Sequence, residues 1–450
     1  MSFEELGNAF WQWLEKNGST LSDGIKFHDY RDSEGAGRGV IATRDLQEDE
    51  VLFTIPRPLL LSSQTSRLRQ EKDMAEILDK MSGWNPLILC LMYESQRSDS
   101  FWKPYFDVLP KDFSTPMFWD KQELNALEGT DIVEKIGKEE AEAMFFQEIQ
   151  PILKDHPEIF NSDVHNVDLF HQCGSLIMSY SFHDEKATPK MTQKNDDNGN
   201  DDGEDGENED EDQEEGLLAM VPMADMLNHK TGYNNARLFH EPNCLRMKAI
   251  KFIKAGDQIY NTYGDLCNAD LLRKYGFADE NNSFDLVEIN GGQVVELCCD
   301  DTDASLRDRK IEFLMEEEAL DDCFVIDTEY ILPPELISTL HVLRASAEEF
   351  EKMESKQKLP KPKLTPTIAK LGMQILEERL KRYPQEDDNQ TLMQTKCNRN
   401  KRHALLVRIG EKKILEETIN KLKKEAEGQK RSAEGGQDNK DHINKKKKKN

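Results

Sequence analysis

Segments with the pattern of short β-strands occur in two distant parts of this chain. The β-branched, apolar runs Val40–Ala42 and Val51–Ile55 mark the first part. The alternating run Cys244–Ile250 and the segment Gln258–Asn261, joined through a Lys-Ala-Gly-Asp turn, mark the second part. The strands therefore surround an inserted helical block, and a second helical block follows them. This order predicts an α+β protein.

Helical periodicity covers most of the remaining chain. An amphipathic helix is expected over residues 3–17, and a short helix over Asp270–Tyr275 that is closed by Gly276. The inserted block contains three expected helices, which are Trp84–Tyr93, Ala141–Leu153 and Val167–Phe182. The C-terminal block contains four, which are Asp303–Met315, Pro333–Met353, Thr365–Tyr383 and Lys401–Glu427.

An acidic, glycine-broken segment, Lys186–Gly216, interrupts this pattern. It has almost no apolar residues and cannot offset its ordering entropy, so we expect a disordered loop. A solvated loop is favoured over an electrostatic guide for a basic substrate. The segment Asp196–Glu215 holds thirteen of the 87 acidic residues, so the rest of the net charge of −28 is −15, with 74 acidic against 59 basic residues. Charge therefore does not indicate direct binding to nucleic acid.

The eight cysteines are scattered and form no C-x-x-C pair, which favours reduced thiols in a cytosolic or nuclear protein. No window reaches the roughly 18–20 apolar residues of a membrane span, and the N-terminus has no signal-peptide h-region. The basic run Lys445–Lys449 fits a nuclear address or a solubilising tail equally well. His165 and His171, near acidic residues, have neither helical i, i+4 nor zinc-finger spacing, so no metal site is expected.

Three short motifs carry the chemistry. They are Gly35–Val40 with glycines at alternate positions, Ala224–His229 ending in Asn-His, and Tyr260–Gly264. Alternate glycines let a backbone turn close to a ligand, but no third glycine at position 40 and no following helix exist for a dinucleotide fingerprint. Taken singly, each motif fits a plain structural element: a turn, a helix cap or a tyrosine in a strand end.

Together and in this order, the three motifs resemble the SET domain of S-adenosylmethionine-dependent protein-lysine methyltransferases. The layout is similar to the Rubisco large-subunit methyltransferase class, in which a helical insert splits a β-rich core with a pseudoknot and an all-helical domain follows. The likeness covers roughly residues 20 to 425. A closer likeness, to one vertebrate member of this class, is carried by segments that include Ser82–Trp84, Met117–Trp119, Val221-Pro222 and Asn243–Met247.

The resemblance implies a domain order and site residues. The expected parts are an N-terminal helix (1–24), a first core part (25–66), a helical insert (67–185), the acidic loop (186–216), a second core part with the active site (217–285), a helical substrate-binding domain (286–427) and a disordered basic tail (428–450). The catalytic residue is Tyr263. Cofactor contacts are expected from Ala36, Gly37, Arg38, Tyr180, Asn228, His229 and Tyr263, and substrate contacts from Trp84, Tyr180 and His183.

The resemblance also implies S-adenosyl-L-methionine as cofactor and proteins with exposed lysines as partners. Chromatin proteins or transcription factors, such as a subunit of NF-κB, are the expected substrates, and the nucleus, with the cytoplasm, is the expected location. Two alternatives remain at this point. A relative of this class methylates histidine, and the same motifs fit that acceptor. A catalytically silent reader or scaffold is less favoured, because Tyr263 and the Asn-His pair are all present.

Overall fold

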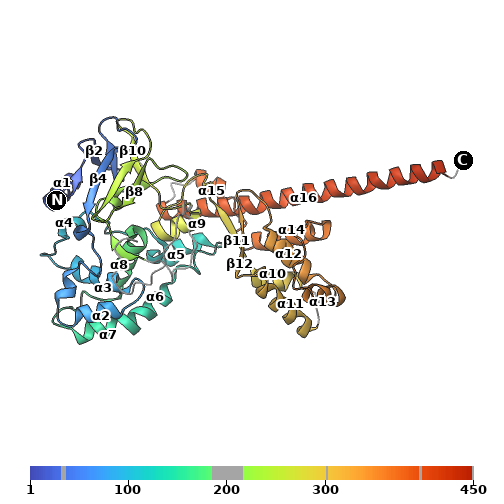
Figure 1. Ribbon diagram of the computed structural model, residues 1–450, viewed down its shortest axis with the longest axis horizontal. Helices are drawn as coiled ribbons and strands as arrows, with labels where there is room; N and C mark the ends of the chain where they lie inside the picture. The colour runs from blue at the N-terminus through green and yellow to red at the C-terminus, as the bar shows by residue number, and fades with distance from the viewer. Residues whose placement is uncertain (32–36, 185–215, 300–302, 395–397, 448–450) are drawn as a thin grey trace, which may run out of the picture. The chain divides into compact units, whose positions relative to one another are not determined.

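The computed structural model describes residues 1–31, 37–184, 216–299, 303–394 and 398–447, with side chains up to residue 427 (Figure 1). The chain divides into two compact units. Unit 1 comprises Met1–Phe118, Ile136–Leu266 and Arg273–Gly276. Unit 2 comprises Trp119–Lys135, Cys267–Leu272 and Phe277–Asn450. The segments of the chain thus alternate between the two units.

Unit 1 contains a four-stranded sheet that joins the two distant strand regions. Its order is β1 (Thr20–Leu21), β4 (Val51–Pro56), β9 (Cys244–Ala249) and β8 (Ala236–His240). The central pair is antiparallel, with Ile55 opposite Leu245. Both of these side chains are fully buried. Apolar burial therefore holds together strands that are almost 190 residues apart in the sequence.

A second four-stranded sheet of unit 1 has a mixed topology. Its order is β2 (Ile25–Asp29), β3 (Arg38–Ala42), β10 (Gln258–Asn261) and β7 (Asn228–His229). Strand β10 is antiparallel to β3 and parallel to the two-residue strand β7. This parallel pairing brings the segment after the acidic loop against a strand that begins thirty residues later.

Helices of unit 1 cover one large apolar core. Helix α1 (Phe3–Lys16) begins at Ser2, whose side chain and that of Glu5 form a capping box. Its buried Phe10 and Leu14 face the core. The other helices are α2 (Met74–Lys80), α3 (Asn85–Ser95), α4 (Lys103–Phe106), α6 (Lys138–Met144), α7 (Gln150–Asp155) and α8 (Val167–Tyr180). A π-helical turn, Phe145–Ile149, joins α6 to α7 within the expected helix Ala141–Leu153.

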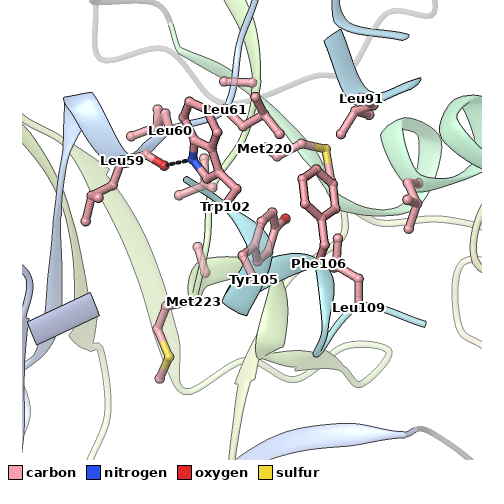
Figure 2. Close-up of a cluster of buried hydrophobic side chains, with 14 of the residues drawn as sticks. Leu59, Leu60, Leu61, Leu91, Trp102, Tyr105, Phe106, Leu109, Met220 and Met223 are labelled. Atoms are coloured by element: carbon pink, nitrogen blue, oxygen red, sulfur yellow. Dashed lines mark hydrogen bonds between the residues drawn. The ribbon is translucent and has the colours of Figure 1, made fainter. Parts of the chain in front are cut away.

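The core around α4 is drawn in Figure 2, where Tyr105 and Phe106 lie among leucines from three other segments. The indole Nε1 of Trp102 donates a hydrogen bond of 2.9 Å to the carbonyl oxygen of Leu59. A buried indole N–H that lacks an acceptor is costly, so this bond fixes the orientation of Trp102. Helix α4 is thereby held at a defined position beside the sheet.

The expected helix Val167–Phe182 is too long by two residues. Helix α8 ends at Tyr180, where Ser181 adopts an extended conformation. Residues Ser181–Asp184 instead form β5, which pairs with β6 (Leu217–Met220). Non-local pairing with β6 supplies the hydrogen bonds that another helical turn would have made, and helical periodicity does not register such a partner.

Unit 2 is mostly helical and contains a separate core. Its helices are α5 (Lys121–Leu124), α9 (Asn268–Asp270), α10 (Gly291–Cys298), α11 (Ala304–Glu316), α12 (Pro334–Leu343), α13 (Ala347–Glu354), α14 (Pro366–Leu380), α15 (Asp388–Gln394) and α16 (Arg399–Lys447). The helical backbone of α16 includes residues 428–447, a stretch for which the sequence predicted disorder. An antiparallel pair, β11 (Leu286–Asn290) and β12 (Cys323–Asp327), corrects the expectation of an all-helical region.

The expected single helix Pro333–Met353 is two helices, α12 and α13. The buried ammonium group of Lys310 donates to the carbonyl oxygens of Leu343 and Ala345, at 3.1 and 2.7 Å. Ser346 then begins α13 as the N-cap of a capping box with Glu349. A C-terminal cap from a distant lysine and a local N-cap together end one helix and start the next.

A partly buried histidine in unit 2 makes its stability depend on pH. The N–H of Ala278 donates to Nδ1 of His403 at 3.0 Å, so this nitrogen carries no proton. Burial, assisted by Arg399, lowers the pKa of His403 to about 4. The unfolded chain binds a proton near pH 6.5, so the stabilisation is complete above that pH and is lost as pH falls toward 4.

We therefore expect the wild type to lose about 2 kcal/mol of unfolding free energy from His403 between pH 7.5 and pH 5. His403→Asn keeps an acceptor for Ala278 but cannot titrate. Denaturant unfolding of both proteins at the two pH values measures the difference, which removes the contribution of all other groups. An equal pH dependence in both proteins would contradict this assignment.

Among the helices that the structure describes, none is both long and apolar enough to cross a membrane.

Candidate active site

The Asn-His pair lies on β7, directly after the 3₁₀ turn η7 (Ala224–Met226). Asn228 is opposite Tyr260 and His229 is opposite Asn261 on the parallel strand β10. The amide nitrogen of Asn228 donates to Oε1 of Gln258 at 2.8 Å. This contact orients the Asn228 side chain, which is half-buried beside β3.

Gly39 on β3 makes room for this pair. A Cβ atom at position 39 would lie 2.8 Å from Asn228 Nδ2 and 2.8 Å from Gln258 Oε1, with Tyr30 at the same distance. Any side chain there would displace the hydrogen-bonded amides. Of the alternate glycines in the first motif, Gly39 is thus required for packing in the described structure, whereas a Cβ at Gly37 would meet nothing within 4 Å.

Tyr263 joins the two motifs. Its main-chain N–H donates to Nδ1 of His229 at 3.1 Å, and its phenol donates to the carbonyl oxygen of Leu227, also at 3.1 Å. Since Nδ1 of His229 accepts a hydrogen bond and therefore carries no proton, a neutral ring has its proton on Nε2. The rings of His229 and Tyr263 are stacked, with centroids 5.1 Å apart. Side chains from two separate motifs therefore form one rigid unit.

A second ring, that of Tyr275, also stacks on Tyr263. The ring of Tyr275 lies 4.5 Å from that of Tyr263 and nearly parallel to it. Tyr275 ends the π-helical turn η8 (Leu271–Tyr275), and the hydroxyl of Ser179 at the end of α8 donates to the carbonyl of Lys274 at 2.6 Å. The end of α8 is thereby tied to the segment that carries Tyr275.

Burial raises the pKa of Tyr263 well above its usual value, and the neighbouring Tyr180, Tyr275 and Asp225 raise it further. The phenol consequently stays protonated at any physiological pH. A protonated phenol that donates to Leu227 still has oxygen lone pairs that accept hydrogen bonds. At Tyr263 the site therefore offers a neutral phenol oxygen that can accept a hydrogen bond.

The glycine-rich motif is described only in part. Ala36 lies outside the described residues. Gly37 has φ +80°, a conformation that favours glycine, and it opens β3. The guanidinium of Arg38 packs 3.7 Å from the centroid of the Phe3 ring in α1, and burial lowers its pKa to about 10. Because this side chain is engaged with α1, only the main chain of Arg38 is available to the motif.

The three residues predicted to contact the substrate differ in burial and in their surroundings. Tyr180 at the end of α8 is half-buried and lies close enough to Tyr263 to raise its pKa. His183 is exposed on β5, three residues later. Trp84 precedes α3, packs partly against the core of unit 1 and accepts a hydrogen bond from the N–H of Ile88. The packing of Trp84 matches an anchor of the helix, and its role toward a substrate stays a prediction.

Sequence reasoning missed three members of this cluster, which are Asp225, Tyr105 and Tyr275. Asp225 is buried on η7 and accepts a hydrogen bond from the phenol of Tyr105 on α4. A lone acidic residue inside the apolar run Leu217–Leu227 was an available signal. No local pattern marks Tyr105 or Tyr275, because their position depends on the tertiary fold.

His165 and His171, the two histidines considered above as metal ligands, contact neighbouring protein groups. Nδ1 of His165 lies 3.0 Å from the main chain of Asn161, and Nε2 of His171 lies 3.6 Å from Glu142. Burial lowers the pKa of both imidazoles. Across the described ranges, no group of three or more His, Cys, Asp or Glu residues could hold a metal ion.

Comparison with protein families gives two matches. Residues 37–264 match the SET domain, and residues 301–415 match the Rubisco LSMT substrate-binding domain. The first match begins at Gly37 and ends directly after Tyr263, so it includes the Asn-His and Tyr motifs and the described part of the glycine motif. Both families are those expected from the motif order.

Similar proteins agree with these matches. The N-lysine methyltransferase setd6 of Danio rerio is 36% identical over 362 residues, covering 76% of this chain and 74% of that protein. The N-lysine methyltransferase setd6 of Xenopus tropicalis is 31% identical over 446 residues, covering 91% of this chain and 93% of that protein. The closer likeness to one vertebrate member is thus confirmed.

Solved structures confirm the fold. A crystal structure of the SET domain of LSMT bound to lysine and AdoHcy superposes with a TM-score of 0.69, at 21% identity, covering 94% of this chain and 92% of that chain. A structure of Rubisco LSMT bound to AdoMet gives the same TM-score and coverage at 20% identity. The expected α+β core with helical additions is therefore the fold of this chain.

Proposed function

The chain belongs to the SET-domain family of S-adenosylmethionine-dependent protein-lysine N-methyltransferases, and we propose that the cluster around Tyr263 methylates lysines in exposed segments of nuclear proteins. The observation that supports this assignment is the stack His229–Tyr263–Tyr275, with the phenol of Tyr263 fixed on Leu227. The contacts between His229 and Tyr263 bring the Asn-His motif and the Tyr motif together in one site. Histones and transcription factors, including an NF-κB subunit, are the proposed substrates.

The chemistry requires an uncharged amine. Free lysine has a pKa of about 10.4, so presenting the neutral amine near pH 7.4 costs about 4 kcal/mol. Bound S-adenosylmethionine supplies an electrophilic methyl group on a cationic sulfur. Aromatic, partly buried surroundings disfavour the ammonium form and so lower the pKa of the amine. The rings of Tyr263, Tyr275 and Tyr180 supply such surroundings.

Tyr263 orients the amine in this proposal. Its proton is committed to the carbonyl of Leu227, so its oxygen is left to accept an N–H of the substrate. When the phenol oxygen accepts one N–H of the amine, the nitrogen lone pair points away from the phenol and toward the methyl carbon that is transferred. This role is positioning and electrostatic stabilisation, and it does not require the phenol to ionise.

The cofactor would be held by main-chain and amide groups of unit 1. Gly37 presents an open backbone at the start of β3. Asn228 and His229 lie on β7, the edge strand of the same sheet, and their side chains are already oriented by Gln258 and by Tyr263. Ala36, Arg38 and Tyr180 complete the proposed set, with Arg38 acting through its main chain. Polar amides beside an open backbone suit the amino-acid and adenine ends of the cofactor.

On the substrate side, Tyr180 is the best-placed candidate for the wall of the lysine channel, because it lies close enough to Tyr263 to raise the pKa of that phenol. Trp84 and His183 are proposed as contacts for the flanking peptide. The basic run Lys445–Lys449 supports nuclear import, with the cytoplasm as the second location.

A methyl-labelling experiment tests this function. Purified protein, labelled S-adenosylmethionine and a nuclear extract are combined, and modified residues are identified by mass spectrometry. Label on lysines of nuclear proteins that is absent with Tyr263→Phe supports the proposal. Label on histidine would change the acceptor, and absence of label despite calorimetric binding of the cofactor would favour the scaffold alternative.

A further inference from the structure

A buried acid, Asp225, lies close enough to Tyr263 to affect its pKa, and no cationic group in the described part of the chain forms an ion pair with it. Asp225 is 7% exposed, and its Oδ2 accepts the phenol proton of Tyr105. Its other oxygen, Oδ1, is buried and accepts no hydrogen bond from the described part of the chain. Burying a carboxyl group costs free energy unless the group is hydrogen-bonded, paired or neutral, and buried acids of this kind are frequent at functional sites.

Tyr105 is held firmly from the opposite side. It is fully buried on α4, and its ring is 5.8 Å from that of Phe10 in α1. Figure 2 shows Tyr105 among the packed side chains of the core, and its ring centroid lies 6.0 Å from that of Phe106. Helix α4 is itself fixed through Trp102. The phenol of Tyr105 is thus a fixed point from which a hydrogen bond can hold a less stable segment.

The turn that contains Asp225 is strained and requires support from neighbouring residues. Met223, two residues earlier, is buried with φ +84°, a conformation that a residue other than glycine rarely adopts. The main-chain hydrogen bonds within this turn are 3.2 to 3.4 Å long, including Ala224 N to Val221 O and Leu227 N to Ala224 O. A strained turn persists only when surrounding contacts hold it.

This turn ends on the atoms that the methyl-transfer site uses. The carbonyl of Leu227 accepts the phenol proton of Tyr263, and the next residue is Asn228. A small shift of the turn would move this carbonyl and release the hydroxyl of Tyr263. Small displacements of a group that positions the substrate strongly reduce the rate of an in-line displacement reaction.

We propose that the hydrogen bond between Tyr105 and Asp225 is a positioning pair for methyl transfer, which holds the turn Met223–Leu227 so that the Leu227 carbonyl fixes the hydroxyl of Tyr263. The proposal rests on the role of Tyr263 given above. Neither Tyr105 nor Asp225 touches the reacting atoms through its side chain in this scheme.

The electrostatics of the pair agree with this role. Burial raises the pKa of Asp225 to about 8, while Tyr105 and the main chain of Asp225 and Met223 act in the opposite direction. An acid that is neutral near pH 7 places no negative charge beside Tyr263. A charged carboxylate there would stabilise the ammonium form of the substrate, which cannot be methylated.

The decisive variant is Tyr105→Phe, which keeps the ring and removes only the hydroxyl. A matched control exists in the same unit. Tyr93 on α3 is also buried, and its phenol donates to Oε1 of Glu71 at 2.7 Å. Tyr93→Phe therefore removes the same kind of tyrosine–carboxyl hydrogen bond, and the described neighbours of Tyr93, namely Glu71, Phe160 and Arg97, do not belong to the site.

With the full chain, we expect Tyr105→Phe to lower kcat about tenfold or more, with the Kd for S-adenosylmethionine changed by less than about twofold. Tyr93→Phe should lower the unfolding temperature to a similar extent but leave kcat within about twofold of wild type. A merely structural role would make the two variants equivalent. Equal kcat values for the two would overturn the proposal.

A second pair of variants, at Asp225, tests the proposal even if Tyr105→Phe does not fold. Asp225→Asn keeps an oxygen that accepts from Tyr105, whereas Asp225→Leu has a similar size and no acceptor. We expect Asp225→Asn to retain at least about a third of wild-type kcat and Asp225→Leu to lose about tenfold or more. Equal activity in these two variants would overturn the proposed positioning role of the Tyr105–Asp225 hydrogen bond. Should Tyr263→Phe remain fully active, the assignment of the site itself would fail, which is a separate result.

Discussion

Replacement of Tyr263 by phenylalanine is expected to lower kcat for methyl transfer by about 10²–10³-fold. The substitution leaves the ring that stacks between His229 and Tyr275, and it leaves the main-chain bond to His229. Only the hydroxyl is lost, with its bond to Leu227. Cofactor affinity, measured by calorimetry, should therefore change by less than about fivefold.

Tyr233→Phe provides a control for Tyr263→Phe, because Tyr233 is 40% exposed and lies outside the stack. Its kcat should match that of the wild type. If Tyr263→Phe retained more than about a tenth of wild-type kcat, the phenol would contribute too little to be the group that orients the amine.

Gly39→Ala is expected to weaken S-adenosylmethionine binding by about tenfold or more and to cost about 1–3 kcal/mol of stability. The new methyl group would lie 2.8 Å from both the amide nitrogen of Asn228 and the amide oxygen of Gln258. These atoms form one hydrogen bond of 2.8 Å, so relief of the clash requires that this hydrogen-bonded pair of amides shift. Asn228 would then leave its position beside His229. Calorimetric titration with the cofactor and thermal unfolding measure the two effects.

Gly174→Ala is the matched control for Gly39→Ala. Gly174 lies within α8, and a Cβ there would meet nothing within 4 Å. Alanine in a helix interior is favoured over glycine by up to about 1 kcal/mol, so this variant should be equally or more stable and bind the cofactor normally. Wild-type cofactor affinity in Gly39→Ala would contradict the placement of Asn228 at the cofactor site.

The sequence alone determined the layout of the fold. Apolar, β-branched runs and helical periodicity indicated the strands around Val51 and Cys244 and most of the helices, because burial imposes a repeat that can be read locally. The motif order around Asn228 and Tyr263 indicated the SET family, which the family matches confirmed. The boundaries that failed, at Phe182 and between α12 and α13, depend on β6 and on Lys310, which are distant partners.

Only the tertiary structure decided which side chains surround the reacting groups. Tyr105, Asp225 and Tyr275 come from three segments separated by up to 170 residues, and each reaches Tyr263 or its supporting turn through packing that has no sequence period. The sequence therefore determines which residues can carry out the chemistry. The fold determines how they are held, since hydrogen bonds and ring stacking depend on distances that only chain topology sets.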